Sequence, residues 1–419
     1  MITAEEALRQ IGEIESLESV EANWEAAQAL MPEEGPGFLS PEAIRENRAW
    51  CSFGPEADEP LLRAAGRIRA DEALLRLAWQ CDWRLYDSAE PIWSGGWPSF
   101  EAALGEDAGL FYLLIGLDLA PRLRAYHSRL GIPEEITRET LLEPRAFSLN
   151  YAQMYPGRLG IPRSQLFWLR FYLYEKFFRL GRFEYWLKPF RGGAHAYRSR
   201  RTGQVLALAP AGARIDAHGY MPRSDAPPAP GEWSAELTVC DGKAAGAPIS
   251  PLGHVERRQV VLDLAEWEPV LSPGDWVLDF HIPAGGGMTP AACHDSFRRA
   301  AAFFSERFPE TPPAAFVCFS WIYNPDLERI LPAGSNLVLN LGDAYLFPTP
   351  SGGHDGLWFI FFQDHFDLAS APRRTSVQRA VWDWLAAGKP WRSGGMFYLT
   401  ADLDHLGTQV YRRQAGLVR

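Results

Sequence analysis

Residues Trp276–Phe304, WVLDFHIPAGGGMTPAACHDSFRRAAAFF, contain the pattern that decides the fold. The apolar run Trp276–Ile282 is typical of a buried strand, and three glycines follow it at 285, 286 and 287. Thr289 and Pro290 then suit the N-cap and the first turn of a helix, since Thr caps free N–H groups and Pro has no N–H to satisfy. The sequence predicts a strand, a glycine loop and a helix in direct succession.

The glycine loop is a candidate anion site. Glycines let the backbone approach a phosphate without a Cβ clash, and the helix N-terminus adds a partial positive charge, so two phosphates can be held without a side-chain cation. A Walker loop is excluded because no Gly-Lys-Ser/Thr follows, and the G-x-G-x-x-G spacing of a dinucleotide site is absent. A diphosphate cofactor such as coenzyme A fits what remains, and an ordinary flexible connection is the alternative.

The first part of the chain is predicted to be helical. Ser40 and Pro41 have the character of a helix cap and first turn, and the turn-rich stretch Asp87–Pro98 is expected to form a loop. We place a domain boundary after residue 140, which gives a helical domain of residues 1–140 and a second domain of residues 141–419. Apolar residues recur at helical spacing in Ala4–Ile14, Ser19–Leu30, Pro60–Leu77 and Leu110–Leu130.

The second domain is predicted to hold a mixed β-sheet. A long aromatic helix is expected from Arg163 to Leu180, and strand patterns bounded by Gly, Pro or Asp follow it. Helical patterns return only later, at Ala291–Phe308, Asp326–Ile330 and Ser376–Ala387. This order indicates an α+β or mixed α/β fold. The expected strands are Phe183–Phe190, Val205–Ala209, Trp233–Val239, Gln259–Leu264, Trp276–Ile282, Ala315–Trp321, Leu357–Phe362 and Met396–Leu399.

Composition narrows the class of protein. The 419 residues are 47% hydrophobic and 13% aromatic, as in well-packed globular proteins. A net charge of −11 argues against nucleic acid or an anionic membrane as a partner. An acidic N-terminus without a signal pattern, and the lack of a run of about 18 apolar residues, predict a cytoplasmic protein. The widely spaced cysteines, expected to be buried free thiols, are Cys51, Cys81, Cys240, Cys293 and Cys318.

The element order resembles that of the GNAT acyltransferases, which use acyl-CoA. Their pyrophosphate loop follows the fourth strand with the pattern R/Q-x-x-G-x-G/A, and Ile282–Gly287 (IPAGGG) stands in that frame. Gly285 and Gly287 match the two glycine positions of the pattern, while Ile282 replaces the leading Arg or Gln. Binding of the phosphates is then left to backbone N–H groups. The segments His281–Cys293, Phe316–Trp321 (FVCFSW) and Arg179–Arg182 (RLGR) further resemble bacterial acyltransferase-domain proteins, in which an N-acyltransferase-like helical domain precedes a GNAT-like domain.

The resemblance implies roles for individual residues. Asp279 and His281 are two apart on the fourth strand and so share one face, where either would deprotonate an attacking amine. Tyr323 would protonate the departing thiolate. A structural histidine and a pocket-lining tyrosine are the alternatives for His281 and Tyr323. Acetyl-CoA or another acyl-CoA would be the co-substrate, held by Ile282, Ala284, Gly285, Gly286, Gly287, Met288 and Thr289.

Other reactive residues carry no recognisable signature. Cys318 is expected to be a packing thiol rather than a nucleophile. Gln363–Asp367 and Ala401–His405 contain carboxylates and a histidine, but their spacing specifies no metal, so we expect surface turns and no metal cofactor. No G-x-S-x-G elbow supports a serine hydrolase.

The sequence thus predicts an acyl-CoA-dependent N-acyltransferase that acts on a small-molecule amine or a peptide acceptor. A non-catalytic sensor that keeps the fold and binds coenzyme A or another ligand is the alternative, and Ile282 favours it. A carbohydrate-binding protein that stacks sugars on some of the 16 Trp side chains is a third hypothesis.

Overall fold

In the computed structural model, which describes residues 2–89 and 95–418, the chain divides into two compact units. The first unit comprises residues 1–179 and 283–285, and the second comprises residues 180–282 and 286–419. The division between Arg179 and Leu180 comes later in the chain than the boundary expected after residue 140, because residues 141–179 pack with the helices that precede them. Within the described ranges, no helix combines the length and apolar character needed to cross a bilayer.

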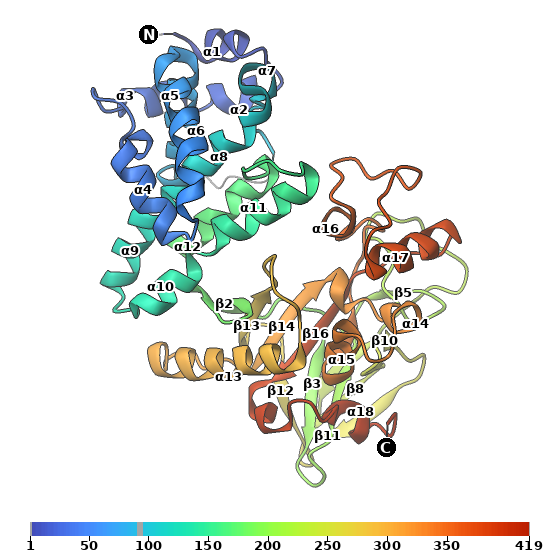
Figure 1. Ribbon diagram of the computed structural model, residues 1–419. Helices are drawn as coiled ribbons and strands as arrows, with labels where there is room; N and C mark the ends of the chain where they lie inside the picture. Colours follow the sequence, from blue (N-terminus) through green and yellow to red (C-terminus); the bar gives the residue numbers. More distant parts are fainter. Residues whose placement is uncertain (1, 90–94, 419) are drawn as a thin grey trace. The chain divides into compact units, whose positions relative to one another are not determined.

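The first unit is helical, as predicted (Figure 1). The hydroxyl of Ser40 accepts a hydrogen bond from the N–H of Ala43 at the start of one helix, which confirms the predicted cap. Part of the predicted loop Asp87–Pro98 lies outside the described residues. The helices are α1 (Ala4–Gln10), α2 (Leu17–Glu21), α3 (Trp24–Ala29), α4 (Pro41–Trp50), α5 (Asp58–Ala70), α6 (Glu72–Tyr86), α7 (Glu101–Leu104), α8 (Ala108–Leu117), α9 (Leu119–Arg129), α10 (Glu134–Thr140), α11 (Glu143–Met154) and α12 (Phe171–Tyr174), with the 3-10 helices η1 (Gly37–Leu39), η2 (Pro55–Ala57), η3 (Gly105–Asp107) and η4 (Arg163–Arg170).

Helix α8 forms the centre of this unit. All 10 of its residues are buried, so it has no polar face and must be surrounded by other elements. Its glycines permit close packing, because a Cβ at Gly109 would lie 2.3 Å from the ring of Tyr151 and a Cβ at Gly116 would lie 2.8 Å from Ile161. Larger residues at these two positions would push the packed segments apart.

The prediction of one long aromatic helix from Arg163 to Leu180 is wrong. The structure has the 3-10 helix η4, the single turn α12 and then a strand, β1 (Phe177–Leu180). Apolar residues are so dense in this stretch that their periodicity does not separate a buried helix from a buried strand.

A buried histidine makes the stability of the helical unit depend on pH. His127 is 1% exposed, its Nδ1 lies 2.9 Å from the hydroxyl of Thr137, and burial lowers its pKa to about 4. The unfolded chain, with a histidine pKa of about 6.5, therefore binds more protons between pH 4 and 6.5. The stabilising contribution is complete above about pH 6.5 and disappears as the pH falls to about 4, where the loss reaches about 3 kcal/mol.

The variant His127→Asn keeps a polar atom near Thr137 but cannot titrate. We expect the difference in unfolding free energy between the wild-type protein and this variant to shrink by about 3 kcal/mol between pH 7 and pH 4. Urea denaturation at several pH values in this range measures the difference. A difference that stays constant with pH would show that His127 is not kept neutral by burial.

The second unit is built from strands, with helices in its later part. Its strands are β1 (Phe177–Leu180), which begins before the division, β2 (Phe183–Pro189), β3 (His195–Ser199), β4 (Val205–Leu208), β5 (Arg214–Ile215), β6 (Trp233–Ser234), β7 (Leu237–Cys240), β8 (Lys243–Gly246), β9 (Pro248–Ser250), β10 (His254–Val255), β11 (Val260–Asp263), β12 (Trp267–Leu271), β13 (Trp276–His281), β14 (Ala315–Ser320), β15 (Tyr345–Pro348) and β16 (Gly394–Leu399). Its helices are α13 (Pro290–Arg307), α14 (Leu327–Ile330), α15 (Asn336–Asp343), α16 (Leu357–Phe361), α17 (Ser376–Ala386) and α18 (Val410–Gln414), with the 3-10 helices η5 (Trp321–Tyr323) and η6 (Thr400–His405).

The strands form the predicted mixed sheet. Its order is β1-β2-β13-β14-β16-β15, with β13 antiparallel to β2, β14 parallel to β13, and β16 antiparallel to both β14 and β15. A second sheet has the order β10-β9-β4-β3-β12, and smaller sheets contain β11-β8-β7 and β5-β6. The chain is therefore an α+β protein with a helical part followed by a mixed-sheet domain.

Both faces of the six-stranded sheet are covered. On one face, α13 runs beside the strands (Figure 1), and its Phe297 ring lies 4.5 Å from that of Phe316 and 5.2 Å from that of Phe280. On the other face, the hydroxyl of Tyr345 donates a hydrogen bond to the carbonyl of Ile249 at 2.6 Å, which joins β15 to the second sheet. The core of this unit therefore consists of a helix layer and two sheet layers.

Three further predictions for this unit need correction. The expected strand Leu357–Phe362 is the helix α16, another apolar run whose periodicity is ambiguous, and the expected strand Trp233–Val239 is divided between β6 and β7. Cys240 is exposed, while the other four cysteines are buried as expected. It lies at the end of β7, where the strand turns into β8 and its side chains face solvent.

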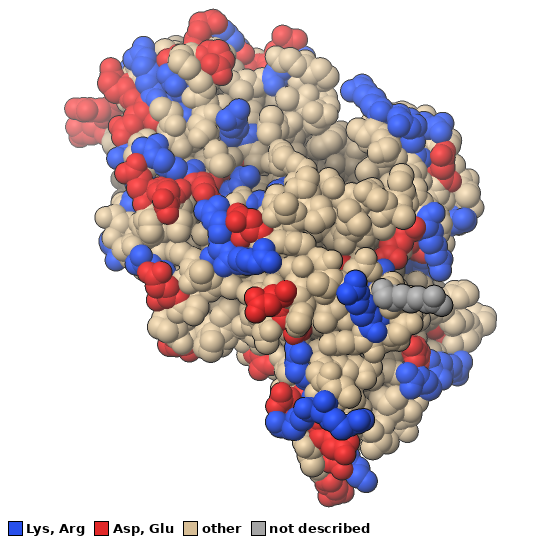
Figure 2. Space-filling model, turned by 60° about the horizontal axis from the view of Figure 1, so that its bottom comes forward, with Lys and Arg blue, Asp and Glu red and all other residues tan. Residues whose placement is uncertain are grey.

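Charged side chains of both signs are interspersed on the face drawn in Figure 2. Many pair locally at the surface, such as Arg9 with Glu5 and Arg200 with Glu268, each at 2.6 Å. Exposed pairs of this kind contribute about 0 to 1 kcal/mol each. Over most of this face, side chains of opposite sign therefore lie close enough to offset one another.

Candidate functional site

The two central parallel strands separate toward their carboxyl ends. β13 and β14 pair from Val277 with Ala315 to Asp279 with Val317. Pairing between these strands ends there, whereas β13 stays paired with β2 through His281 and β14 stays paired with β16 through Ser320. The glycine loop follows β13 directly, at the end where the pairing with β14 has stopped.

Two glycines of the loop have backbone conformations that favour glycine. Gly285 and Gly286 have φ values of 82° and 72°, in the left-handed region that favours glycine. Among the described residues, none accepts a hydrogen bond from the backbone N–H of Gly286, Gly287 or Met288. The three glycines and Thr289 are exposed, Ile282 and Ala284 are half-buried, and Met288 is buried.

Two side chains fix the carbonyl groups of this loop. Nε of Arg182 donates to the carbonyl of Gly287 at 3.2 Å, and Nδ2 of Asn340 donates to the carbonyl of Met288 at 2.8 Å. In a trans peptide, the carbonyl of one residue and the N–H of the next point in opposite directions. The N–H groups of Met288 and Thr289 therefore point away from these two side chains.

Helix α13 begins immediately after the loop and adds to its attraction for an anion. The hydroxyl of Thr289 accepts a hydrogen bond from the N–H of Ala292 at 3.3 Å, and Pro290 occupies the first turn, which confirms the predicted cap. The helix is 18 residues long and has no acidic side chain in its first turn. Its partial positive charge is therefore not neutralised at this end, and the arrangement is able to hold a phosphate group.

Asp279 is held in an ion pair on the face of β13 that points away from α13. Its Oδ2 lies 2.5 Å from Nζ of Lys188 on β2, and its side chain is 8% exposed. The Lys188 ammonium also lies 4.3 Å from the centre of the Trp186 ring. The positive charge of Lys188 compensates the negative charge of the buried Asp279, and the ion pair holds the Asp279 carboxylate in place.

His281 lies on the same face of β13, opposite Glu184 of β2. It is half-buried, and burial lowers its pKa to about 4, while Asp279 raises the pKa and Lys188 lowers it. The imidazole is therefore neutral at pH 7 and has a lone pair that can accept a proton.

Tyr323 is on the other side of β13. Its ring lies 6.1 Å from that of Phe280 at a 90° angle, and Phe280 packs toward α13. The residue is 2% exposed, and burial raises the pKa of its hydroxyl well above the usual range, so the phenol keeps its proton. The structure thus brings Asp279 and His281 to one face of the strand and Tyr323 to the opposite face.

Cys318 on β14 is buried, and burial raises the pKa of its thiol well above the usual value. A thiolate is required for nucleophilic attack, and this environment disfavours it. The interpretation of Cys318 as a packing residue is consistent with its position.

A pocket of about 380 Å³ at the end of β14 was not foreseen from the sequence. Phe319, which is 44% exposed, lines it together with Met221, Pro348 and Pro350, and Arg191 and Asp355 add charges. Phe319 alternates with Cys318 and so lies on the face shared by Val317 and its partner Asp279. The only sequence features at this pocket are Arg191-Gly-Gly and the proline-rich turn after β15. Neither feature predicts a pocket by itself, because the fold is needed to bring the two segments together.

Two family models match the chain. The GNAT-like C-terminal domain matches residues 177–397, and the N-acyltransferase N-terminal domain matches residues 43–173. No curated protein matches the chain in sequence.

Solved structures with a similar fold include several acyltransferases. One, in complex with CoA and 10C-teicoplanin, has a TM-score of 0.63 at 20% sequence identity. Another, in complex with decanoyl-CoA, has a TM-score of 0.59 at 22% identity, and a tryptophan-to-alanine mutant in complex with octanoyl-CoA has a TM-score of 0.62 at 19% identity. Each comparison covers 95% of this chain and 99% of the other, so the likeness in fold extends over both units.

Proposed function

The chain belongs to the family defined by the GNAT-like C-terminal domain, and from this premise we propose that it is an acyl-CoA-dependent N-acyltransferase. Its acceptor is proposed to be an amine on a small molecule or a peptide. Two features support the proposal: the fold, which it shares with acyltransferases, and the backbone geometry of the loop between β13 and α13.

The observation that carries the proposal is that the backbone N–H groups of Gly286, Gly287 and Met288, just before α13, have no hydrogen-bond acceptor among the described residues. The pyrophosphate of coenzyme A needs donors rather than a specific side chain, and N–H groups with fixed directions supply them. The side chain of Ile282 cannot donate a hydrogen bond, so backbone N–H groups are proposed to bind the pyrophosphate. The proposed cofactor-binding residues are Ile282, Ala284, Gly285, Gly286, Gly287, Met288 and Thr289.

The reaction we propose is direct attack by the amine. The amine nitrogen forms a bond to the carbonyl carbon of the thioester, the carbon–sulfur bond breaks, the nitrogen loses one proton and the sulfur gains one. His281 accepts the proton from nitrogen, because its imidazole is neutral, while the charge of Asp279 is already compensated by Lys188. Tyr323 is the proposed donor to sulfur, which would leave on the side of β13 opposite His281.

The proposed acceptor region is the pocket beside Phe319. Its apolar wall suits a ring or an alkyl group, and it opens on the face of the sheet that carries Asp279 and His281. One of the similar acyltransferases was solved with decanoyl-CoA and teicoplanin, a complex that suggests medium-chain acyl groups and glycopeptide amines as the first compounds to test. The cytoplasmic location remains a prediction from the sequence.

The test is to measure free thiol release from acetyl-, octanoyl- and decanoyl-CoA with a panel of amines that includes aminosugars, glycopeptides and peptides. We expect at least one acyl-CoA and acceptor pair to give thiol and an equal amount of amide, detected by mass spectrometry. Coenzyme A binding should be measured on the same protein by calorimetry. Failure to bind any coenzyme A derivative would contradict the proposal as a whole.

A second candidate function is a non-catalytic protein that binds coenzyme A or another ligand. The observation that favours it is Ile282, which replaces the Arg or Gln of the acyltransferase pattern. Tight binding of coenzyme A, together with no turnover for any acceptor in the panel, would support this function over the enzymatic one.

A further inference from the structure

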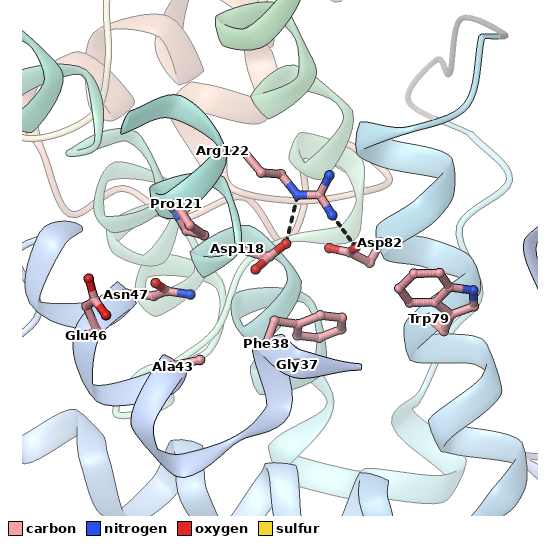
Figure 3. A pocket seen from close by; sticks show the side chains of 10 residues that line it. All are labelled: Gly37, Phe38, Ala43, Glu46, Asn47, Trp79, Asp82, Asp118, Pro121 and Arg122. Carbon is pink, nitrogen blue, oxygen red and sulfur yellow. Dashed lines mark hydrogen bonds and ion pairs between the residues drawn. The ribbon is translucent and has the colours of Figure 1, made fainter. Parts of the chain in front are cut away.

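The helical unit contains a pocket that has no role in the proposed reaction. Its volume is about 380 Å³, and Figure 3 shows the side chains that line it. The wall is assembled from four separate segments: Phe38 of η1, Asn47 of α4, Asp82 of α6, and Asp118 with Arg122 at the start of α9. All four segments lie within residues 1–179, so the pocket is complete within this unit.

The charges around the pocket do not balance. Arg122 forms ion pairs with Asp82 at 2.9 Å, Asp87 at 3.0 Å and Asp118 at 2.8 Å, so one guanidinium faces three carboxylates. Two of these carboxylates, Asp82 and Asp118, line the pocket. Glu46, which also lines it, is paired with Arg124 at 2.6 Å. The pocket is therefore rich in negative charge that a bound cation would compensate.

One oxygen atom in this cluster is buried without a partner. Oδ2 of Asp82 accepts a hydrogen bond from Arg122, but Oδ1 has no hydrogen-bond partner among the described residues, and the residue is 0% exposed. Figure 3 shows the carboxylate of Asp82 turned toward Asp118 across the pocket. Burial and the neighbouring carboxylate of Asp118 raise the pKa of Asp82 well above its usual value, so the ionised form of Asp82 is disfavoured until a cation compensates its charge. A buried polar atom without a partner is costly, and a donor in the pocket would remove that cost.

Part of the wall is apolar and fixed in place. Phe38, Pro121 and Trp79 line the pocket around the carboxylates, with Pro121 and Trp79 on opposite sides of the view in Figure 3. Nε1 of Trp79 donates a hydrogen bond to the carbonyl of Ala27 at 2.6 Å, which holds the indole in one orientation. Such a surface suits an alkyl chain, whereas the carboxylates suit a group that carries several N–H donors.

We propose that this pocket binds a primary alkylammonium ion, with its nitrogen between Asp82 and Asp118 and its carbon chain against Phe38 and Trp79. An ammonium group supplies three donors and one positive charge, which match the unpartnered Oδ1 of Asp82 and the excess of carboxylates. The site is independent of the proposed acyl transfer, because it uses none of the residues assigned to that reaction.

The test compares two ligands that share a carbon chain and differ in charge. Isothermal titration calorimetry of the full-length protein at pH 7.5 and low salt would use pentylamine, which is protonated, and 1-pentanol, which is neutral. We expect saturable binding of pentylamine and binding of 1-pentanol at least tenfold weaker. Equal binding of the two ligands, or no saturable binding of pentylamine, would overturn the proposal. This comparison needs only the wild-type protein.

Matched variants then locate the site. Asp118→Asn and Asp87→Asn each remove one carboxylate that pairs with Arg122, but only Asp118 lines the pocket. We expect Asp118→Asn to weaken pentylamine binding at least tenfold and Asp87→Asn to change it by less than twofold. Equal losses in the two variants would show that general electrostatic attraction, rather than this pocket, accounts for the binding, and would contradict the proposal.

Discussion

Replacement of Gly286 by valine is expected to weaken coenzyme A binding about ten- to hundredfold. The backbone of Gly286 has a φ of 72°, which a β-branched residue adopts only under strain, and the new side chain would project where the phosphates must approach. Relief of the strain would turn the neighbouring N–H groups away from their present directions. The loss of one charge-assisted hydrogen bond, which contributes about 1.5 to 3 kcal/mol, gives the expected range. Calorimetric titration with coenzyme A measures it.

Gly242 provides a matched control for this variant. It has the same φ of 72° and, like Gly286, has open space around the position of a Cβ, but it lies in the turn between β7 and β8. Gly242→Val should therefore reproduce the backbone strain and leave coenzyme A affinity unchanged. Equal affinity losses in the two variants, or unchanged affinity in a folded Gly286→Val, would contradict the assignment of the loop as the phosphate site.

Replacement of His281 by alanine is expected to lower kcat about 100- to 10,000-fold, the usual contribution of a general base, with little change in coenzyme A affinity. The reason is that the imidazole is neutral at pH 7 and lies on a strand beside the separation of β13 and β14, whereas the loop that is proposed to bind the cofactor does not depend on it. Steady-state kinetics with the acceptor identified from the amine panel, together with coenzyme A titration, measures both quantities.

The variant His281→Gln serves as the control for loss of hydrogen bonding, because glutamine keeps a polar group but cannot accept the proton at neutral pH. It should be nearly as inactive as His281→Ala. Full activity of the glutamine variant would assign His281 a structural role, and a kcat within twofold of wild type in both folded variants would exclude it as the base.

The local features of the glycine segment could be predicted from the sequence because they depend on neighbours in the chain. A strand pattern, three glycines and Thr289 before Pro290 specify a strand, a loop and a capped helix through local rules, and the structure contains all of them. The same rules failed for Leu357–Phe362, where a short apolar run is compatible with a helix or a strand.

What could not be predicted comes from contacts between distant residues. The ion pair of Lys188 with Asp279 depends on the register of β2 against β13, and the hydrogen bond from Asn340 to the carbonyl of Met288 depends on α15, a helix that the sequence analysis missed. The face occupied by Tyr323 depends on how η5 turns after β14. The carboxylate pocket of the helical unit combines four segments, none of which is unusual by itself.

The hydrogen bonds from Arg182 and Asn340 to the glycine loop have a consequence for binding kinetics. Since the carbonyls of Gly287 and Met288 are fixed without any ligand, an arriving anion meets a surface that is already ordered and pays little conformational entropy to organise it. Association should then proceed in one step without a slow rearrangement. Differences in affinity between related acyl donors should be expressed mainly as differences in residence time.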